Sequence, residues 1–187
     1  MLALFRCSMI MALALFAFGT HSAFAAYVTD FSVNARTKSE LHTLTAHAYN
    51  TGVSVQAGQT LSVTVDPNSR WSIRTQSSGW RITADGVGDP VDITGDMGTG
   101  SFKLGTLVGY ILGNDGTTNT GYLGIGTAGL DWAATFDGIL YMVCWDTYYS
   151  DNFHSLDTTI SVTPIPGAVW LLGAGLVGLI GLRRKTA

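Results

Sequence analysis

Short stretches in which apolar and polar side chains alternate dominate the central part of the chain. Residues 61–65 alternate in this way, and residues 71–75 and 160–162 continue the pattern. Such alternation is typical of half-buried strands. Residues 139–145 are instead apolar without a break, which predicts a central strand covered on both faces. Helix signals are scarce throughout residues 26–163.

Turn signals separate these stretches. Asp-Gly pairs stand at residues 85–86 and 137–138, and Gly-Asn-Asp-Gly stands at residues 113–116. Many short strands without helices predict an all-β fold, an antiparallel β-sandwich or jelly roll. We expect residues 26–163 to form this domain, because they are numerous enough to bury a core of their own.

The N-terminal 25 residues show the three-part pattern of a secretion signal. Arg6 precedes an apolar run over residues 9–18, and Ala23 and Ala25 supply the small residues that a signal peptidase inspects. We therefore expect cleavage immediately before Ala26. The run is shorter than the roughly 20 apolar residues of a spanning helix. An ordinary buried helix at the start of a domain is the alternative.

The C-terminal segment, residues 164–187, has an equally distinct pattern. Pro164 and Pro166 interrupt the last predicted strand, and residues 167–182 follow without a charge. The basic residues 183–185 close the apolar run, so we expect a membrane helix with its basic end in the cytoplasm. Such a helix is about 24 Å long against about 30 Å of hydrocarbon, which suits a temporary anchor.

Residues 162–185 resemble the PEP-CTERM sorting signal, in its variant with a Val-Pro-Leu-Pro-Ala motif. Thr163 stands where that variant usually has Val. The sorting motif here consists of Pro164, Ile165, Pro166 and Gly167. In the PEP-CTERM family an exosortase is thought to process this region. The resemblance implies an exported bacterial protein that is sorted from an inner-membrane intermediate to the cell surface or extracellular matrix. A plain tail anchor is the alternative, but it does not explain the proline motif.

Acidic residues outnumber basic ones in the predicted outer domain. Residues 26–163 contain all 13 acidic residues of the chain and six basic residues, a net charge of −7 against −3 for the whole chain. Nucleic acid is a poor partner for such a surface. Twelve of the acids are Asp, whose short carboxylates in Gly-rich turns suit calcium, although Asp is also common in turns for backbone reasons. Cys144 has apolar neighbours, which predicts a buried and inert thiol.

The clearest candidate for a binding site follows the apolar stretch 139–145. The predicted strand leads to Asp146, and Asp151 and Asn152 precede the next strand, so three oxygen-bearing side chains converge within seven residues. Calcium takes about six to eight oxygen ligands, so backbone carbonyls or a second loop must complete the shell. An Asp-rich hairpin without a metal is the alternative.

Residues 138–162 resemble the calcium-dependent, galactose-binding bacterial lectin family called PA-IL, and residues 51–65 look like its early strands. The resemblance implies a small β-sandwich, with a backbone carbonyl near Asp85 completing the calcium shell. It implies side-chain calcium ligands at Asp146, Asp151 and Asn152. The sequence departs from the family at Trp145, which replaces Asn, and at Phe153-His154, which replaces Ser-Gly. The family's separate sugar-contacting His and Gln have no match here.

Aromatic residues around the acidic loop favour a sugar ligand. Trp145, Tyr148, Tyr149 and Phe153 surround the loop, and an exposed ring beside a cation can hold a sugar. We expect Tyr148 and Tyr149 to contact the sugar together with Asp146, with packing inside the domain as the alternative. The remaining tryptophans of the outer domain are expected in the core, namely Trp71, Trp80 and Trp132.

No catalytic motif accompanies the acidic loop. The chain lacks His-Glu-x-x-His, Gly-x-Ser-x-Gly and Cys-x-x-Cys, and the spacing of His42 and His47 fits no single face of a strand or helix. The other acidic run, with Asp85, Asp89, Asp92 and Asp96, lacks EF-hand spacing and predicts solvated turns. We therefore expect a non-enzymatic, calcium-dependent carbohydrate-binding domain at the cell surface or in extracellular polysaccharide. A structural or adhesion protein of the matrix without a sugar ligand is the alternative.

Overall fold

The computed structural model describes residues 26–36, 48–74, 80–95, 97–146 and 148–163. They belong to one compact unit, Ala26–Thr163. The predicted signal peptide, sorting motif and membrane helix lie outside the described residues, as do His42, His47 and Asp96. In the described part of the chain, no helix is long and apolar enough to cross a membrane.

The described residues form nine strands and one short 3₁₀ helix. The strands are β1 (Tyr27–Asn34), β2 (Tyr49–Val55), β3 (Thr60–Val65), β4 (Asp85–Gly95), β5 (Gly98–Gly113), β6 (Leu123–Gly124), β7 (Leu130–Ala133), β8 (Gly138–Cys144) and β9 (Ser155–Thr163), and the 3₁₀ helix is η3 (Tyr149–Asp151).

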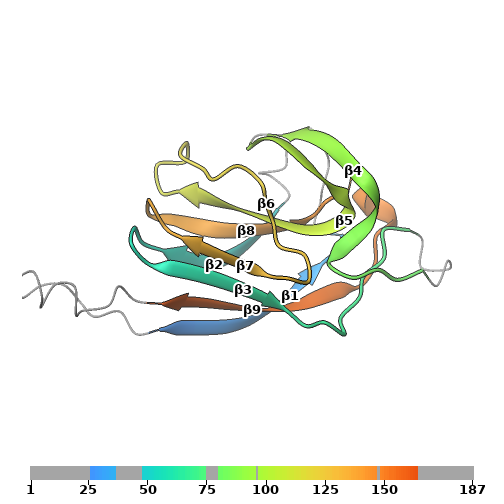
Figure 1. Cartoon of the computed structure of the whole chain (residues 1–187), viewed down its shortest axis with the longest axis horizontal. Helices are drawn as coiled ribbons and strands as arrows, with labels where there is room; N and C mark the ends of the chain where they lie inside the picture. Colours follow the sequence, from blue (N-terminus) through green and yellow to red (C-terminus); the bar gives the residue numbers. More distant parts are fainter. Residues whose placement is uncertain (1–25, 37–47, 75–79, 96, 147, 164–187) are drawn as a thin grey trace, which may run out of the picture. The chain divides into compact units, whose positions relative to one another are not determined.

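The strands make two antiparallel sheets that face each other (Figure 1). The first sheet has the order β1-β9-β3-β7, and the second has the order β2-β8-β5-β4 with β6 paired to β5. The register is continuous from Tyr27 opposite Val162 to Asn34 opposite Ser155 in the β1–β9 pair. The predicted all-β, antiparallel fold is confirmed, and its two layers form a sandwich.

One hydrophobic core fills the space between the two sheets. Successive strand residues point to opposite faces, so the apolar residues of an alternating strand can all face this space. The alternation in β3 places its apolar side chains inside and Thr64 outside. The core includes Val33, Leu61, Val63, Leu156 and Ile160 from the first sheet and Val53, Leu107, Ile111, Leu140 and Met142 from the second. Trp71 is fully buried in this core, whereas Trp80 and Trp132 are half-buried against it.

A second apolar cluster covers the outer face of β8 and β5, which explains why residues 139–145 carry no polar residue. The β4–β5 hairpin folds over this face, so that Phe102 meets the ring of Trp145 edge-on at 5.1 Å. Nε1 of Trp145 donates a hydrogen bond to the Val91 carbonyl at 3.1 Å. Trp145 is only 1% exposed, so the expectation that its ring faces the acidic loop as a possible sugar contact is wrong.

Candidate functional site

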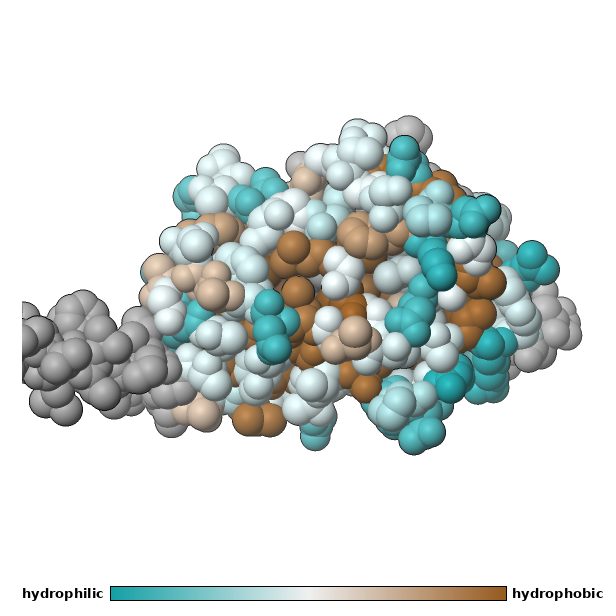
Figure 2. Space-filling model, viewed as in Figure 1, coloured by the Kyte–Doolittle hydropathy of each residue, from teal (hydrophilic) through white to brown (hydrophobic). Residues whose placement is uncertain are grey.

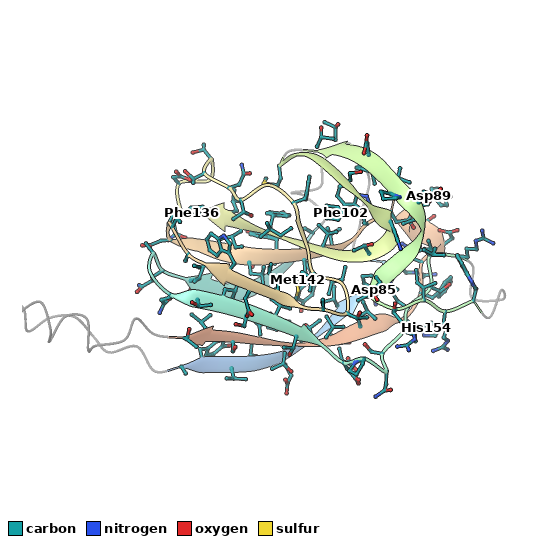
Figure 3. All side chains as sticks on the ribbon, in the orientation of Figure 1. Asp85, Asp89, Phe102, Phe136, Met142 and His154 are labelled. Carbon is teal, nitrogen blue, oxygen red and sulfur yellow. The ribbon has the colours of Figure 1, made fainter. Side chains whose placement is uncertain are left out.

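The acidic segment between β8 and β9, called the hairpin although its two strands belong to different sheets, lies at the end of the domain where His154 is labelled in Figure 3. The start of β1 and the end of β9 lie together at the opposite end (Figure 1). Figure 2 shows hydrophobic residues in the middle of the face that β6 and β7 form, and hydrophilic residues toward the end with the hairpin. The hairpin therefore lies at the end of the domain opposite to the first residue of β1 and the last residue of β9.

Two oxygen-bearing side chains of the hairpin are shielded from solvent. Asp146 is 7% exposed, and its Oδ1 accepts a hydrogen bond from the Tyr148 amide at 3.2 Å. Asn152 is fully buried, and its Nδ2 donates to the Ala35 carbonyl at 3.1 Å. Because a carbonyl can only accept, this contact orients the Asn152 amide and directs its Oδ1 the other way.

Two buried oxygens of the hairpin have no hydrogen-bond donor among the described residues. They are Oδ1 of Asp151 and Oδ1 of Asn152, adjacent residues at the end of η3. A buried oxygen without a partner costs about 1–3 kcal/mol, so such atoms are rare and require an explanation. A bound cation would supply the missing partner for both.

The donor chemistry of the hairpin fits calcium. Asp146, Asp151 and Asn152 offer carboxylate and amide oxygens, which are the ligands that calcium prefers. No group of three or more His, Cys, Asp and Glu side chains converges among the described residues. The candidate ligands of the hairpin are accordingly two carboxylates and one amide. Backbone carbonyls and water would have to fill the remaining coordination positions.

Two segments distant in sequence hold the hairpin in place. Ser72 and Phe153 exchange backbone hydrogen bonds of 2.9 Å, which joins the hairpin to the segment after β3. At the end of β1, the Ala35 amide donates to the His154 carbonyl at 2.9 Å. Nε of Arg36 donates to the Asn152 carbonyl at 2.6 Å, and its guanidinium lies 4.0 Å from the centre of the Phe153 ring. The hairpin is therefore fixed from both sides.

His154 adopts a backbone conformation that glycine favours. Its φ is 68°, and it is the one described residue other than glycine with a positive φ. The left-handed region costs most residues about 1–2 kcal/mol. Glycine adopts it freely, whereas the His154 side chain makes it strained. This strain lies two residues after Asn152.

Asp85 has partners of its own at the start of β4. Its carboxylate accepts hydrogen bonds from the amide and the Oγ1 of Thr127, both at 2.7 Å, and these bonds lower the pKa of Asp85. Its carbonyl accepts a hydrogen bond from Oγ1 of Thr106 at 3.1 Å. The Thr127 contacts tie β4 to the turn after β6, and the Thr106 contact ties it to β5. The structure places Ser72 against the hairpin, a pairing that no sequence signal near Ser72 indicated.

The aromatic residues around the hairpin divide into buried and exposed rings. Tyr148 is 65% exposed and lies two residues beyond Asp146 in the chain. Phe153 is half-buried beneath Arg36. The side chain of Tyr149 lies outside the described part of the structure. Tyr148 is therefore the described aromatic ring that a ligand at the hairpin can reach.

A hollow of about 560 Å³ lies on the outer face of the first sheet, away from the hairpin residues. Its carboxylates come from Asp30, Asp66 and Asp157. Asp30 accepts a hydrogen bond from Oγ1 of Thr159 at 2.7 Å, and Asp66 accepts one from the Asn68 amide at 2.8 Å. All three carboxylates are exposed, so water can hydrate them and the hollow gives no indication of a bound ion.

The comparisons with known proteins find a distant likeness among solved structures. No protein-family model matches the chain, and no curated protein matches it. Among solved structures, the chain is similar to one described as "EclA N-terminal domain; PllA-like lectin", with 16% sequence identity and a TM-score of 0.35. The similarity covers 72% of this chain and 94% of that chain. This likeness is too distant to support a function, which has to be argued from the hairpin itself.

Proposed function

We propose that the outer domain binds carbohydrate with the help of a calcium ion held by the β8–β9 hairpin. The observation that carries the proposal is the pair of buried, unpartnered oxygens on Asp151 and Asn152, in the same short segment as the shielded carboxylate of Asp146. Calcium binding would remove the free-energy cost of both oxygens. The same ion would offset the repulsion between the two carboxylates of the hairpin.

The surroundings of the hairpin suit a sugar ligand. A hairpin-bound calcium ion has coordination positions that sugar hydroxyl groups can fill, because it accepts neutral oxygen ligands as readily as carboxylates. Tyr148 adds an exposed aromatic face close to Asp146, against which the apolar face of a sugar ring can pack. Tyr149 is retained as a second candidate contact from the sequence. Asp85 is retained from the sequence as a candidate for a backbone-carbonyl ligand, and its carbonyl also accepts a hydrogen bond from Oγ1 of Thr106.

The proposal also places this domain outside the cell. The support for export is the three-part pattern of residues 1–25, and the support for sorting is the proline motif with its apolar run and basic end. The chain would pass through an inner-membrane intermediate, engage an exosortase-type enzyme and present its domain at the surface or in extracellular polysaccharide. Its role there is binding, without catalysis.

A glycan array tests the proposal directly. The purified full chain in detergent is applied with millimolar calcium and again with a chelator. Calcium-dependent binding to a defined set of glycans is the expected result, and Asp146→Asn should abolish it. Asp131→Asn, which removes the same charge from an exposed position of β7, should leave it intact. Absence of glycan binding under both conditions would favour a structural or adhesion protein of the matrix.

A further inference from the structure

Positive charge is concentrated around the hairpin. The described residues include eleven Asp and only five basic residues. Three of those five lie on the two segments that hold the hairpin, namely Arg36, Arg70 and Arg74. Arg81 lies on the segment that pairs with Trp71, and Lys103 lies on β5. The electrostatic potential is therefore more positive near the hairpin than over the rest of this acidic domain.

Two of these arginines share one face of a small ladder of segments. Antiparallel bridges join Trp71 to Ile82 and Ser72 to Phe153, and the Ala35 amide bonds to the His154 carbonyl. This register places Arg81, Ser72, Phe153 and Arg36 opposite one another in a row. Opposite residues of an antiparallel ladder lie on the same face. Arg74 follows Ser72 by two residues in a bend of the chain, and its amide donates a hydrogen bond to Oγ of Ser72 at 3.2 Å, so its backbone lies beside this row.

Contacts within the described residues hold two of the three arginines in position. Arg36 uses Nε on the Asn152 carbonyl and lies over Phe153, and the guanidinium of Arg74 lies 4.5 Å from the centre of the Trp80 ring. Among the described residues, no carboxylate forms an ion pair with Arg36, Arg74 or Arg81. Stacking on an aromatic ring fixes the plane of a guanidinium and leaves its edge donors available to a ligand. The free donors suit an anion.

We infer that the ligand of the hairpin is an acidic carbohydrate, one whose carboxylates, as in uronic acids, pair with Arg36, Arg74 and Arg81. This inference rests on the proposed function and names the class of glycan. Guanidinium binds carboxylate through two parallel hydrogen bonds, which gives geometric selectivity as well as attraction. The excess of aspartates elsewhere repels a polyanion, so binding is confined to the arginine face, requires calcium at the hairpin and weakens as salt is added.

The test compares two matched trisaccharides on the full chain in detergent. Trigalacturonic acid and galactotriose differ in the carboxylate at carbon 6, and their affinities are measured by titration calorimetry with calcium and with a chelator. We expect calcium-dependent binding of trigalacturonic acid at least tenfold tighter than that of galactotriose. Arg74→Gln and Arg81→Gln should each weaken the acidic ligand about fivefold, equivalent to about 1 kcal/mol. Neither should change galactotriose binding or the melting temperature.

Lys103→Gln is the matched control, because it removes the same charge from an exposed position of β5. It should leave the affinity for trigalacturonic acid unchanged. Equal affinity for the two trisaccharides, or losses no larger in the arginine variants than in the lysine variant, would overturn the inference while calcium-dependent glycan binding stands. If binding of the acid persists in chelator, the joint calcium and arginine site is wrong. If neither trisaccharide nor any glycan on the array binds, the proposed function fails as well.

Discussion

Calcium should stabilise the folded domain, and Asp146→Asn should remove most of this effect. Calcium bound to the native hairpin and not to the unfolded chain raises the free energy of unfolding by mass action. The gain is about 2.7 kcal/mol when free calcium is 100-fold above the dissociation constant. Unfolding entropy of about 2.1 cal/mol/K per residue over about 140 residues converts this gain to an increase of about 9 °C in Tm.

The structure explains why the variant should respond so differently. Asp146 is almost fully shielded, and Asp151 and Asn152 each leave an oxygen without a donor. Replacing the Asp146 carboxylate by an amide removes one of the two negative charges that a hard cation requires in this set. The response to calcium should fall to about 2 °C or less. Magnesium should stabilise the wild type less than calcium, because it demands a smaller and stricter octahedral shell.

The assay is thermal unfolding of the full chain in detergent, followed by far-ultraviolet circular dichroism with chelator and with increasing calcium. Asp131→Asn should keep the full calcium response. An equal increase in Tm for wild type and Asp146→Asn would show that any stabilising calcium binds elsewhere. No increase for the wild type at millimolar calcium would show that the unpartnered oxygens of the hairpin do not form a calcium site.

Three further predictions concern strain, packing and processing. His154→Gly should raise Tm by about 2 °C, since it relieves a left-handed backbone at the cost of some chain entropy, and an unchanged or lower Tm would contradict this. Gly100→Ala should lower the free energy of unfolding by about 1–3 kcal/mol in denaturant titration, because the new methyl would lie 2.8 Å from the Trp145 ring; an unaltered midpoint would refute the packing described. In a host with its sorting enzyme, mass spectrometry should find a mature chain that begins at Ala26 and lacks residues 183–187, whereas an intact C-terminus would indicate a permanent anchor.

The sequence predicted those strands whose two faces differ. β3 and β9 alternate because one face meets the core and the other meets water, and the unbroken run of β8 reflects cover on both sides. The long β4–β5 hairpin was not predicted. Most of β4 is exposed and contains glycine and proline, and its register shifts between Val87 and Pro90, so no period-two pattern marks it.

The candidate site was only partly visible in the sequence, for a related reason. Asp146, Asp151 and Asn152 lie within seven residues of one another, so the sequence alone places them in one short segment between β8 and β9. Arg36 and Ser72 meet the same hairpin from positions about 80 to 116 residues away, through contacts that depend on strand order and register. The burial of Trp145 likewise depends on the β4–β5 hairpin, which folds over it from another part of the chain. Tertiary contacts of this kind have no local sequence pattern.

The most direct test of the central claim is the number of calcium ions that the purified full chain binds, measured by equilibrium dialysis with radioactive calcium. Asp151 and Asn152 supply the two unpartnered oxygens, and Asp146 supplies the second carboxylate. The account predicts one calcium ion per chain at the hairpin, lost in the double variant Asp146→Asn with Asp151→Asn and retained in Asp131→Asn. No bound calcium in the wild type, or undiminished binding in the double variant, would contradict it.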